Sequence, residues 1–184
     1  MESKSTSKEL WKNYNIGITG ANGSLGKALS RKFRGQGARV VGLTHGEIST
    51  KQTTQEGPQE WVQWQCGQED ALKDIFQSLD ILVLNHGINP QQQQSPEALN
   101  SALKINALSS WRLMEFFEQV ALTSNNYSKQ RELWINTSEA EIQPAFSPAY
   151  EISKRLIGQL VSIRWNNLTK QQRKKLRIRK LVLG

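Results

Sequence analysis

The sequence has few of the side chains that build disulfides or metal centres. Its 184 residues include one cysteine, Cys66, and two histidines, His45 and His86. A single cysteine makes no internal disulfide, and these three residues lack the spacing of a zinc site. No apolar run reaches the roughly 20 residues of a membrane span, and the N-terminal MESKSTSKELWK has no apolar signal region. These absences predict a soluble, cytoplasmic chain without a metal.

Acidic residues are missing from one basic segment near the end of the chain. Residues 170–180 hold seven lysines and arginines, and the whole chain has a net charge of +8. The charge therefore belongs to one short segment. Basic side chains are favoured near the C-terminal end of a helix by its dipole, so we interpret the segment as a solvated helix end and turn. We predict no nucleic-acid partner.

Short apolar segments alternate with helical ones along the chain. Strands are expected at residues 15–19, 38–44, 61–65, 80–85, 132–137 and 176–183. A long helix is expected over 96–122 and another over 148–168, with Ile152, Leu156, Leu160 and Ile163 on one stripe. A helix in each connection is typical of a parallel sheet covered on both faces. The sequence predicts an α/β, three-layer, doubly wound Rossmann fold of about six strands, in one domain over residues 1–184.

A glycine-rich loop joins the first strand to the first helix. Gly20 permits a tight turn, Gly23 lets the backbone approach a pyrophosphate, and Gly26 allows the helix to pack closely on the strand. Phosphates would bind the free N–H groups at the start of that helix. A P-loop is excluded, because five residues separate Gly20 from Gly26 and Ala28 replaces the magnesium-binding hydroxyl. The predicted cofactor contacts in this loop are Gly20, Asn22, Gly23, Ser24, Leu25 and Gly26.

The end of the second strand bears on the choice of cofactor. An acidic residue there would bind the ribose hydroxyls of NAD and repel the extra phosphate of NADP. The sequence has Thr44 and His45, and the first acid is Glu47. We therefore favour NADP(H) over NAD(H), with Thr44, His45 and Lys51 near the 2′-phosphate. His45 suits an exposed loop equally well.

Tyr150 and Lys154 are four residues apart and share one face of the last long helix expected. A phenol whose pKa is about 10 is a poor acid or base at neutral pH, and a neighbouring ammonium favours its ionised form. Alone, the spacing also fits a core tyrosine beside a solvated lysine. A catalytic pair is favoured because the helix follows a strand that ends in Asn136, Thr137 and Ser138.

Five segments in order resemble the motifs of the short-chain dehydrogenase/reductase family: ITGANGSLG, DILVLNHGI, KINALSS, INTS with YEISK, and LRIRKLVLG. The resemblance implies hydride transfer between a nicotinamide cofactor and a small carbonyl or alcohol substrate, in a homo-oligomer. Tyr150 would exchange the proton, Lys154 would bind the nicotinamide ribose, and Ser138 would hold the substrate oxygen. Asn106 would position a water that links Lys154 to solvent. The remaining cofactor positions are Asn85 and Gly87 on the ribose side and Cys66, where the family has an acid that holds adenine.

The sequence departs from that family pattern in three places. The glycine spacing is that of the family's extended branch, and Thr137 fits the usual distance from Tyr150 better than Ser138 does. The chain also stops at Gly184, where the family's substrate loop and helical lid begin, so we expect that region to be missing. Two alternatives to a reductase therefore stay open. One is a regulatory NAD(P)-binding protein without catalysis, and the other is a nucleotide-sugar epimerase or dehydratase, against which the short chain argues.

Overall fold

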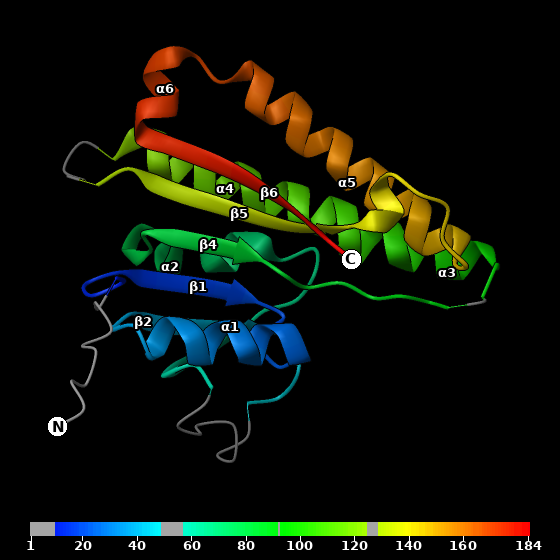
Figure 1. Ribbon diagram of the computed structural model, residues 1–184, viewed down its shortest axis with the longest axis horizontal. Helices are drawn as coiled ribbons and strands as arrows, with labels where there is room; N and C mark the ends of the chain where they lie inside the picture. The colour runs from blue at the N-terminus through cyan, green and yellow to red at the C-terminus, as the bar shows by residue number, and fades with distance from the viewer. Residues whose placement is uncertain (1–9, 49–56, 92, 125–128) are drawn as a thin grey trace, which may run out of the picture.

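The computed structural model describes residues 10–48, 57–91, 93–124 and 129–184 (Figure 1). Six parallel strands form one sheet in the order β3-β2-β1-β4-β5-β6. Their bounds are β1 Asn15–Thr19, β2 Arg39–Thr44, β3 Glu60–Gln63, β4 Ile81–Leu84, β5 Arg131–Ser138 and β6 Leu176–Leu183. Each predicted strand is present within two residues of its expected bounds. The strand order reverses between β1 and β4, which confirms the doubly wound prediction.

The helices are α1 Ser24–Arg34, α2 Lys73–Ser78, α3 Pro96–Ala102, α4 Ser110–Thr123, α5 Pro148–Asn167 and α6 Lys170–Lys175. Short turns of other helix types are η2 Glu69–Leu72, η3 Leu103–Ser109 and η4 Glu139–Glu141. The basic segment forms α6 and the start of β6. Residues 45–48 and 57–59, between β2 and β3, are not helical, and residues 49–56 lie outside the described ranges. The helix expected in that connection is therefore not observed in the part that is described.

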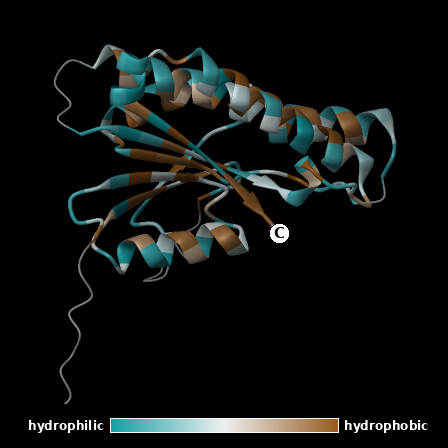
Figure 2. Cartoon of the chain, turned by 45° about the horizontal axis from the view of Figure 1, so that its top comes forward, coloured by the Kyte–Doolittle hydropathy of each residue, from teal (hydrophilic) through white to brown (hydrophobic). Residues whose placement is uncertain are grey.

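The helices cover the two faces of the sheet unequally. Phe33 of α1 packs with Ile16, Val40 and Ile81 of β1, β2 and β4 on one face. A larger cluster, to which α2, α4 and α5 all contribute, fills the other face. Figure 2 shows hydrophobic residues along the strands, which lie between helices that carry both hydrophilic and hydrophobic residues. This layering confirms the three-layer prediction and leaves the carboxyl ends of the strands open at one edge of the sheet.

The helix expected over residues 96–122 is interrupted. Its middle, Leu103–Ser109, has π-helical hydrogen bonding, while α3 and α4 on either side are α-helical. π-Helical turns are rare and often occur at functional sites. Asn106 lies in this segment and is buried. The interruption therefore coincides with a residue that sequence analysis placed in the site.

The apolar stripe predicted for α5 is half right: Leu156 and Leu160 pack against the core, but Ile152 and Ile163 do not. Ile152 and Ile163 are 46% and 48% exposed. The buried face is instead lined by small and branched residues: Ala149, Ser153, Ile157, Gly158 and Val161. Small side chains let a helix approach its neighbours closely, and a Cβ atom at Gly158 would lie 2.2 Å from the carboxyl carbon of Glu141. The close approach of α5 to η3 and η4, rather than the size of its apolar side chains, determines which face of α5 is buried.

None of the described helices is long and apolar enough to cross a bilayer.

The packing of α4 on α2 predicts a large loss of stability when Phe117 is truncated. Phe117 is fully buried and meets Phe76 edge to face, with ring centroids 5.7 Å apart. Phe117→Ala leaves a cavity and should lower the free energy of unfolding by about 3–5 kcal/mol, measured by urea denaturation. Ile163→Ala, at an exposed position, should change it by only about 0.5 kcal/mol. Equal effects of the two changes would contradict this description of the core.

Candidate active site and cofactor cleft

Three adjoining cavities lie at the carboxyl ends of β1, β2, β4 and β5, where doubly wound sheets bind ligands. We call the first, of about 890 Å³, the cofactor cleft, because the glycine loop lines it. The second, the catalytic cavity, has about 370 Å³ and contains Tyr150 and Lys154. The third, the outer cavity, has about 690 Å³ and shares Asn89, Ser138 and Tyr150 with the second. The cofactor cleft and the catalytic cavity share Asn85, His86, Gly87 and Ile88.

The glycine loop has the geometry that a dinucleotide requires. Gly20 has a φ of +64°, and a Cβ atom there would lie 2.9 Å from the Cα atom of His86. A Cβ atom at Gly26 would lie 2.3 Å from the carbonyl oxygen of Gly20. Gly23 begins α1 without a side-chain cap, and the first turn of α1 holds no acid. The N–H groups at this helix end therefore meet no capping side chain of their own chain, which fits a bound phosphate.

The predicted contacts near the end of β2 lie at one side of the cofactor cleft. Asn22, Ser24, Leu25, Thr44, His45 and Cys66 all line it. The Asn22 amide donates to the Thr44 hydroxyl at 3.1 Å, and the backbone N–H of Gly46 donates to the same oxygen at 3.1 Å. Thr44 is thus buried and holds the loop. Lys51 lies outside the described residues.

His45 and Cys66 line the cofactor cleft, and buried Trp64 lies against the His45 ring. The ring of His45 lies against Trp64 with centroids 4.3 Å apart, and its Nε2 atom is 3.5 Å from the Cys66 sulfur. Burial raises the pKa of the Cys66 thiol above its ordinary value. The His45 ring and the Cys66 thiol therefore lie side by side in the lining of the cofactor cleft. Among the described residues, no three His, Cys, Asp or Glu side chains gather as a metal site.

His86 is a residue of the site that sequence analysis did not select. The Thr19 hydroxyl accepts the backbone N–H of Asn85 at 2.9 Å and that of His86 at 3.2 Å, and lies 2.8 Å from His86 Nδ1. The same hydroxyl donates to the Val83 carbonyl at 3.4 Å, so Thr19 joins the end of β4 to the His86 ring. Burial, and then the charges of His45 and Lys154, lower the pKa of His86 to about 3. The ring is therefore neutral, and its only sequence signal was a histidine directly before Gly87.

The Asn106 side chain makes three hydrogen bonds. Its Oδ1 atom accepts the backbone N–H of Ile88 at 2.7 Å, and its Nδ2 atom donates to the Ile88 carbonyl and to Ser153 Oγ, both at 2.8 Å. Ser153 is fully buried and donates in turn to the Tyr150 carbonyl at 2.7 Å. Sequence analysis missed Ser153, which links η3 to the helix that carries Tyr150.

Tyr150 and Lys154 lie together as their spacing predicted. Lys154 is 8% exposed, and its Nζ atom is 5.5 Å from the centroid of the Tyr150 ring. Burial lowers the pKa of Lys154 below its usual value, and the Glu141 carboxylate acts in the opposite direction. A Cβ atom at Gly87 would lie 3.0 Å from Asn106 Oδ1 and 3.8 Å from Lys154 Nζ. The absent side chain of Gly87 thus leaves room where these groups converge.

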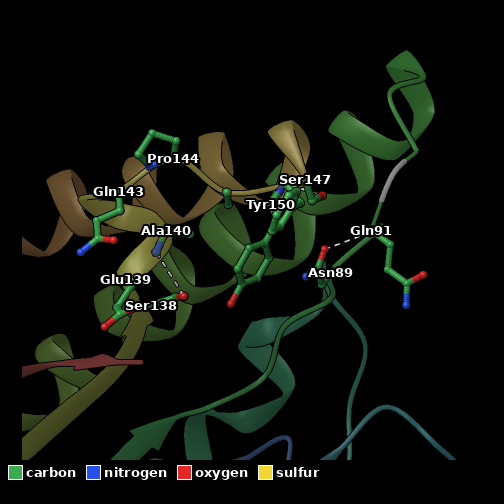
Figure 3. Close-up of a pocket in the computed structure, with 11 residues that line it drawn as sticks. Asn89, Gln91, Ser138, Glu139, Ala140, Gln143, Pro144, Ser147 and Tyr150 are labelled. Atoms are coloured by element: carbon green, nitrogen blue, oxygen red, sulfur yellow. Dashed lines mark hydrogen bonds between the residues drawn. The ribbon is translucent and has the colours of Figure 1, made fainter.

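Ser138 and Thr137 lie differently at the end of β5. Ser138 lines both the catalytic and the outer cavity, and its hydroxyl accepts the Ala140 N–H at 3.3 Å. Thr137 is 2% exposed and donates to the Leu181 carbonyl of β6 at 3.5 Å. In Figure 3 the hydroxyls of Ser138 and Tyr150 point toward one space. This arrangement favours Ser138 over Thr137 as the residue that faces a substrate.

The comparisons with known proteins agree with this geometry. Residues 16–167 match the model of the NAD dependent epimerase/dehydratase family. A curated relative, the monoglucosyldiacylglycerol epimerase of Synechocystis sp., is 40% identical over 171 residues. The match covers 92% of this chain and 40% of the relative. The chain thus spans well under half the length of that protein.

Solved structures share the fold at low sequence identity. A short chain dehydrogenase from Mycobacterium smegmatis has a TM-score of 0.80 at 19% identity, over 95% of this chain and 78% of the other. One from Shigella flexneri has a TM-score of 0.78 at 20% identity, over 96% and 74%. A metagenomic short-chain oxidoreductase in complex with NADP has a TM-score of 0.76 at 22% identity, over 94% and 83%. The fold that the short-chain dehydrogenase/reductase resemblance implied is confirmed.

Neutral His86 predicts a pH-dependent stability. Unfolding restores an ordinary pKa of about 6.5, so below that pH the unfolded chain binds a proton that the folded chain does not. The free energy of unfolding should therefore fall by about 1.4 kcal/mol per pH unit between pH 6 and 5, measured by urea denaturation. His86→Gln should flatten this slope. An unchanged slope in that variant would show that other groups cause it.

Proposed function

The chain belongs to the NAD dependent epimerase/dehydratase family, and from this we propose that it catalyses hydride transfer between NADP(H) and a carbonyl or alcohol carbon. The observation that carries the proposal is the placement of Tyr150 and Lys154. Both lie on one face of α5 in the catalytic cavity, and the cofactor cleft adjoins that cavity through residues 85–88. A proton-transfer group thus lies beside a cleft that fits a dinucleotide.

Each residue of the catalytic cavity has a role in this proposal. Tyr150 gives its phenol proton to a carbonyl oxygen, or takes the proton of an alcohol. Lys154, whose Nζ atom is 5.5 Å from the Tyr150 ring centroid, would bind the ribose of the nicotinamide. Ser138 accepts only the Ala140 N–H among the hydrogen bonds described for it, so its hydroxyl hydrogen suits the substrate oxygen. A bound nicotinamide would supply or accept the hydride.

Asn106 acts in the proposal as a positioning residue. Both of its N–H donors are used by Ile88 and Ser153, and its Oδ1 atom accepts the Ile88 N–H, so it holds the loop after β4 against α5. The resemblance to the short-chain dehydrogenase/reductase family had implied that Asn106 positions a water that links Lys154 to solvent, and the hydrogen bonds support a structural role for its amide.

The preference for NADP(H) over NAD(H) is also part of the proposal. No acid follows β2 directly, since Thr44 and His45 occupy the positions at its end. An acid at this place would repel the 2′-phosphate. One structural neighbour was solved with NADP, which agrees with this preference. The ratio of the dissociation constants for NADPH and NADH measures it directly.

Tyr150→Phe should remove turnover and leave cofactor binding intact, because it deletes one hydroxyl outside the cofactor cleft. The expected loss of rate is about 10²–10⁴-fold, measured as NADPH oxidation with a panel of carbonyl compounds. NADPH affinity, measured by calorimetry, should stay within about twofold. Unchanged turnover would refute the role of Tyr150. Binding without turnover in the unaltered chain would favour the regulatory alternative.

A second candidate function is epimerisation of a sugar carbon. It is favoured by the family match, by the glycine spacing, and by the relative named as an epimerase of monoglucosyldiacylglycerol. An epimerase oxidises a carbinol carbon to a ketone and reduces it again from the other face, with no net use of cofactor. Tyr150 would then take the proton in the first half-reaction and return it in the second.

The two candidates predict different isotope results. In an epimerase, a glycoside deuterated at the reacting carbon should keep its deuterium, and product should exceed the amount of cofactor added. In a reductase, product cannot exceed the reduced cofactor supplied, and the new C–H hydrogen comes from that cofactor. Mass spectrometry of the product with cofactor at about one tenth of substrate separates the two outcomes. Tyr150→Phe is the control, because both candidates lose product in that variant.

A further inference from the structure

Lys104 is an exposed basic side chain in the lining of the cofactor cleft. Among the lining residues that the structure describes, it is the only lysine or arginine. The glycine loop offers a phosphate uncharged backbone N–H groups at the start of α1. The cofactor cleft therefore combines two different kinds of group that bind phosphate.

The π-helical turn η3 determines where the side chain of Lys104 begins. Ser101, Lys104 and Ile105 all line the cleft, and residues three and four apart share one face of a helix. Two residues after Lys104, the side chain of Asn106 binds Ile88 through both its oxygen and its amide nitrogen. These two hydrogen bonds hold η3 against the loop that follows β4. The stem of Lys104 therefore starts at a fixed place beside the cleft.

The charge of Lys104 acts at the same end of the cleft as the residues that follow β2. The Cys66 sulfur is 3.5 Å from His45 Nε2. Burial raises the pKa of this thiol, and the positive charge of Lys104 acts against that rise. In doubly wound folds, the residues after this strand bind the 2′-hydroxyl of NAD, or a nearby cation accommodates the 2′-phosphate of NADP. Lys104 thus supplies a cation where a 2′-phosphate is expected.

Lys104 forms no ion pair or hydrogen bond with another of the described residues. Glu69 is the acid that acts on the Cys66 thiol. Its carboxylate is 1% exposed, accepts the Gly67 N–H at 2.8 Å and pairs with Arg112, so its charge is already engaged within the chain. A lysine ammonium in this position binds phosphate as a compact point charge.

We propose that Lys104 binds the 2′-phosphate of NADP(H) and is a specificity-determining residue of the cofactor cleft. The ammonium donates to the phosphate from η3, while Thr44 and His45 at the end of β2 bring no negative charge that would repel it. A phosphate monoester carries close to two negative charges at neutral pH, so NADPH gains from this cation and NADH does not. This inference rests on the proposed function, whose preference for NADP(H) over NAD(H) it assigns to one side chain.

The test measures the dissociation constants of NADPH and NADH by calorimetry for the unaltered chain, Lys104→Met and Lys104→Arg. Lys104→Met keeps an unbranched apolar stem and removes the charge. It should weaken NADPH binding about tenfold, because it deletes a charge-assisted hydrogen bond, and change NADH binding by less than about twofold. Lys104→Arg keeps the charge and should retain most of the NADPH affinity. Equal losses for NADPH and NADH, or equal losses in the two variants, would overturn the proposal.

Cofactor fragments and a matched control locate the contact. Adenosine 2′,5′-bisphosphate carries the additional phosphate and adenosine 5′-monophosphate does not, so Lys104→Met should weaken only the first, again about tenfold. Lys73→Met removes an exposed lysine from α2, outside the lining of the cofactor cleft, and should change neither affinity. A loss in Lys73→Met as large as that in Lys104→Met would show an effect of net charge, and the proposal would be wrong.

These binding measurements are independent of turnover. If the unaltered chain binds NADPH no more tightly than NADH, the cofactor preference in the proposed function is wrong, and the role of Lys104 is wrong with it. Tighter binding of NADPH that is unchanged in Lys104→Met would remove only the role of Lys104. The expected effect of Lys104→Met in a chain that turns over no carbonyl compound would keep this contact and remove the proposal of hydride transfer.

Discussion

The buried amide of Asn106 joins three parts of the candidate site. A buried amide is costly unless its donors and acceptors are satisfied, and Asn106 satisfies them on Ile88 and Ser153. The first belongs to the loop between the cofactor cleft and the catalytic cavity, and the second to α5. The π-helical hydrogen bonding of η3 occurs at this residue. The regular α-helical hydrogen bonding is thus interrupted at the residue whose side chain contacts two other segments.

The close packing of α5 follows from that link and determines the position of Lys154. Ser153 and Gly158 lie on the face that packs toward η3 and η4, and the Glu141 carboxylate lies against Gly158 where a side chain would not fit. Glu141 also pairs with Lys180 of β6. Glycine within a helix costs about 1 kcal/mol relative to alanine. At Gly158 the missing side chain leaves room for the Glu141 carboxylate, whose negative charge offsets part of the cost of burying the Lys154 ammonium.

Sequence patterns predicted the parts of this molecule that depend on local chemistry. Buried parallel strands appear in a sequence as apolar runs, so all six strands were located. The glycine-rich loop, where a side chain would clash with the backbone, indicated the position of the cofactor cleft. Sequence patterns did not predict the features that depend on which segments pack against a residue. Ile152 and Ile163 were wrongly placed in the core, because α5 approaches η4 closely at Gly158 and a different face of the helix is buried. His86, Ser153 and Glu141 were missed, since their roles depend on partners more than 15 residues away or on main-chain geometry.

The two helices that begin beside these cavities differ in the charge at their first turns. At the cofactor end, α1 begins at an uncapped glycine without an acid in its first turn, and Lys104 lines the cleft. At the outer end, α5 begins at a capping serine with Glu151 in its first turn, and Glu139 lines the cavity. A phosphate-bearing ligand is therefore favoured at the cofactor end. Tyr150 lines the two cavities beyond the cofactor cleft, so the group proposed to exchange a proton lies apart from that helix end.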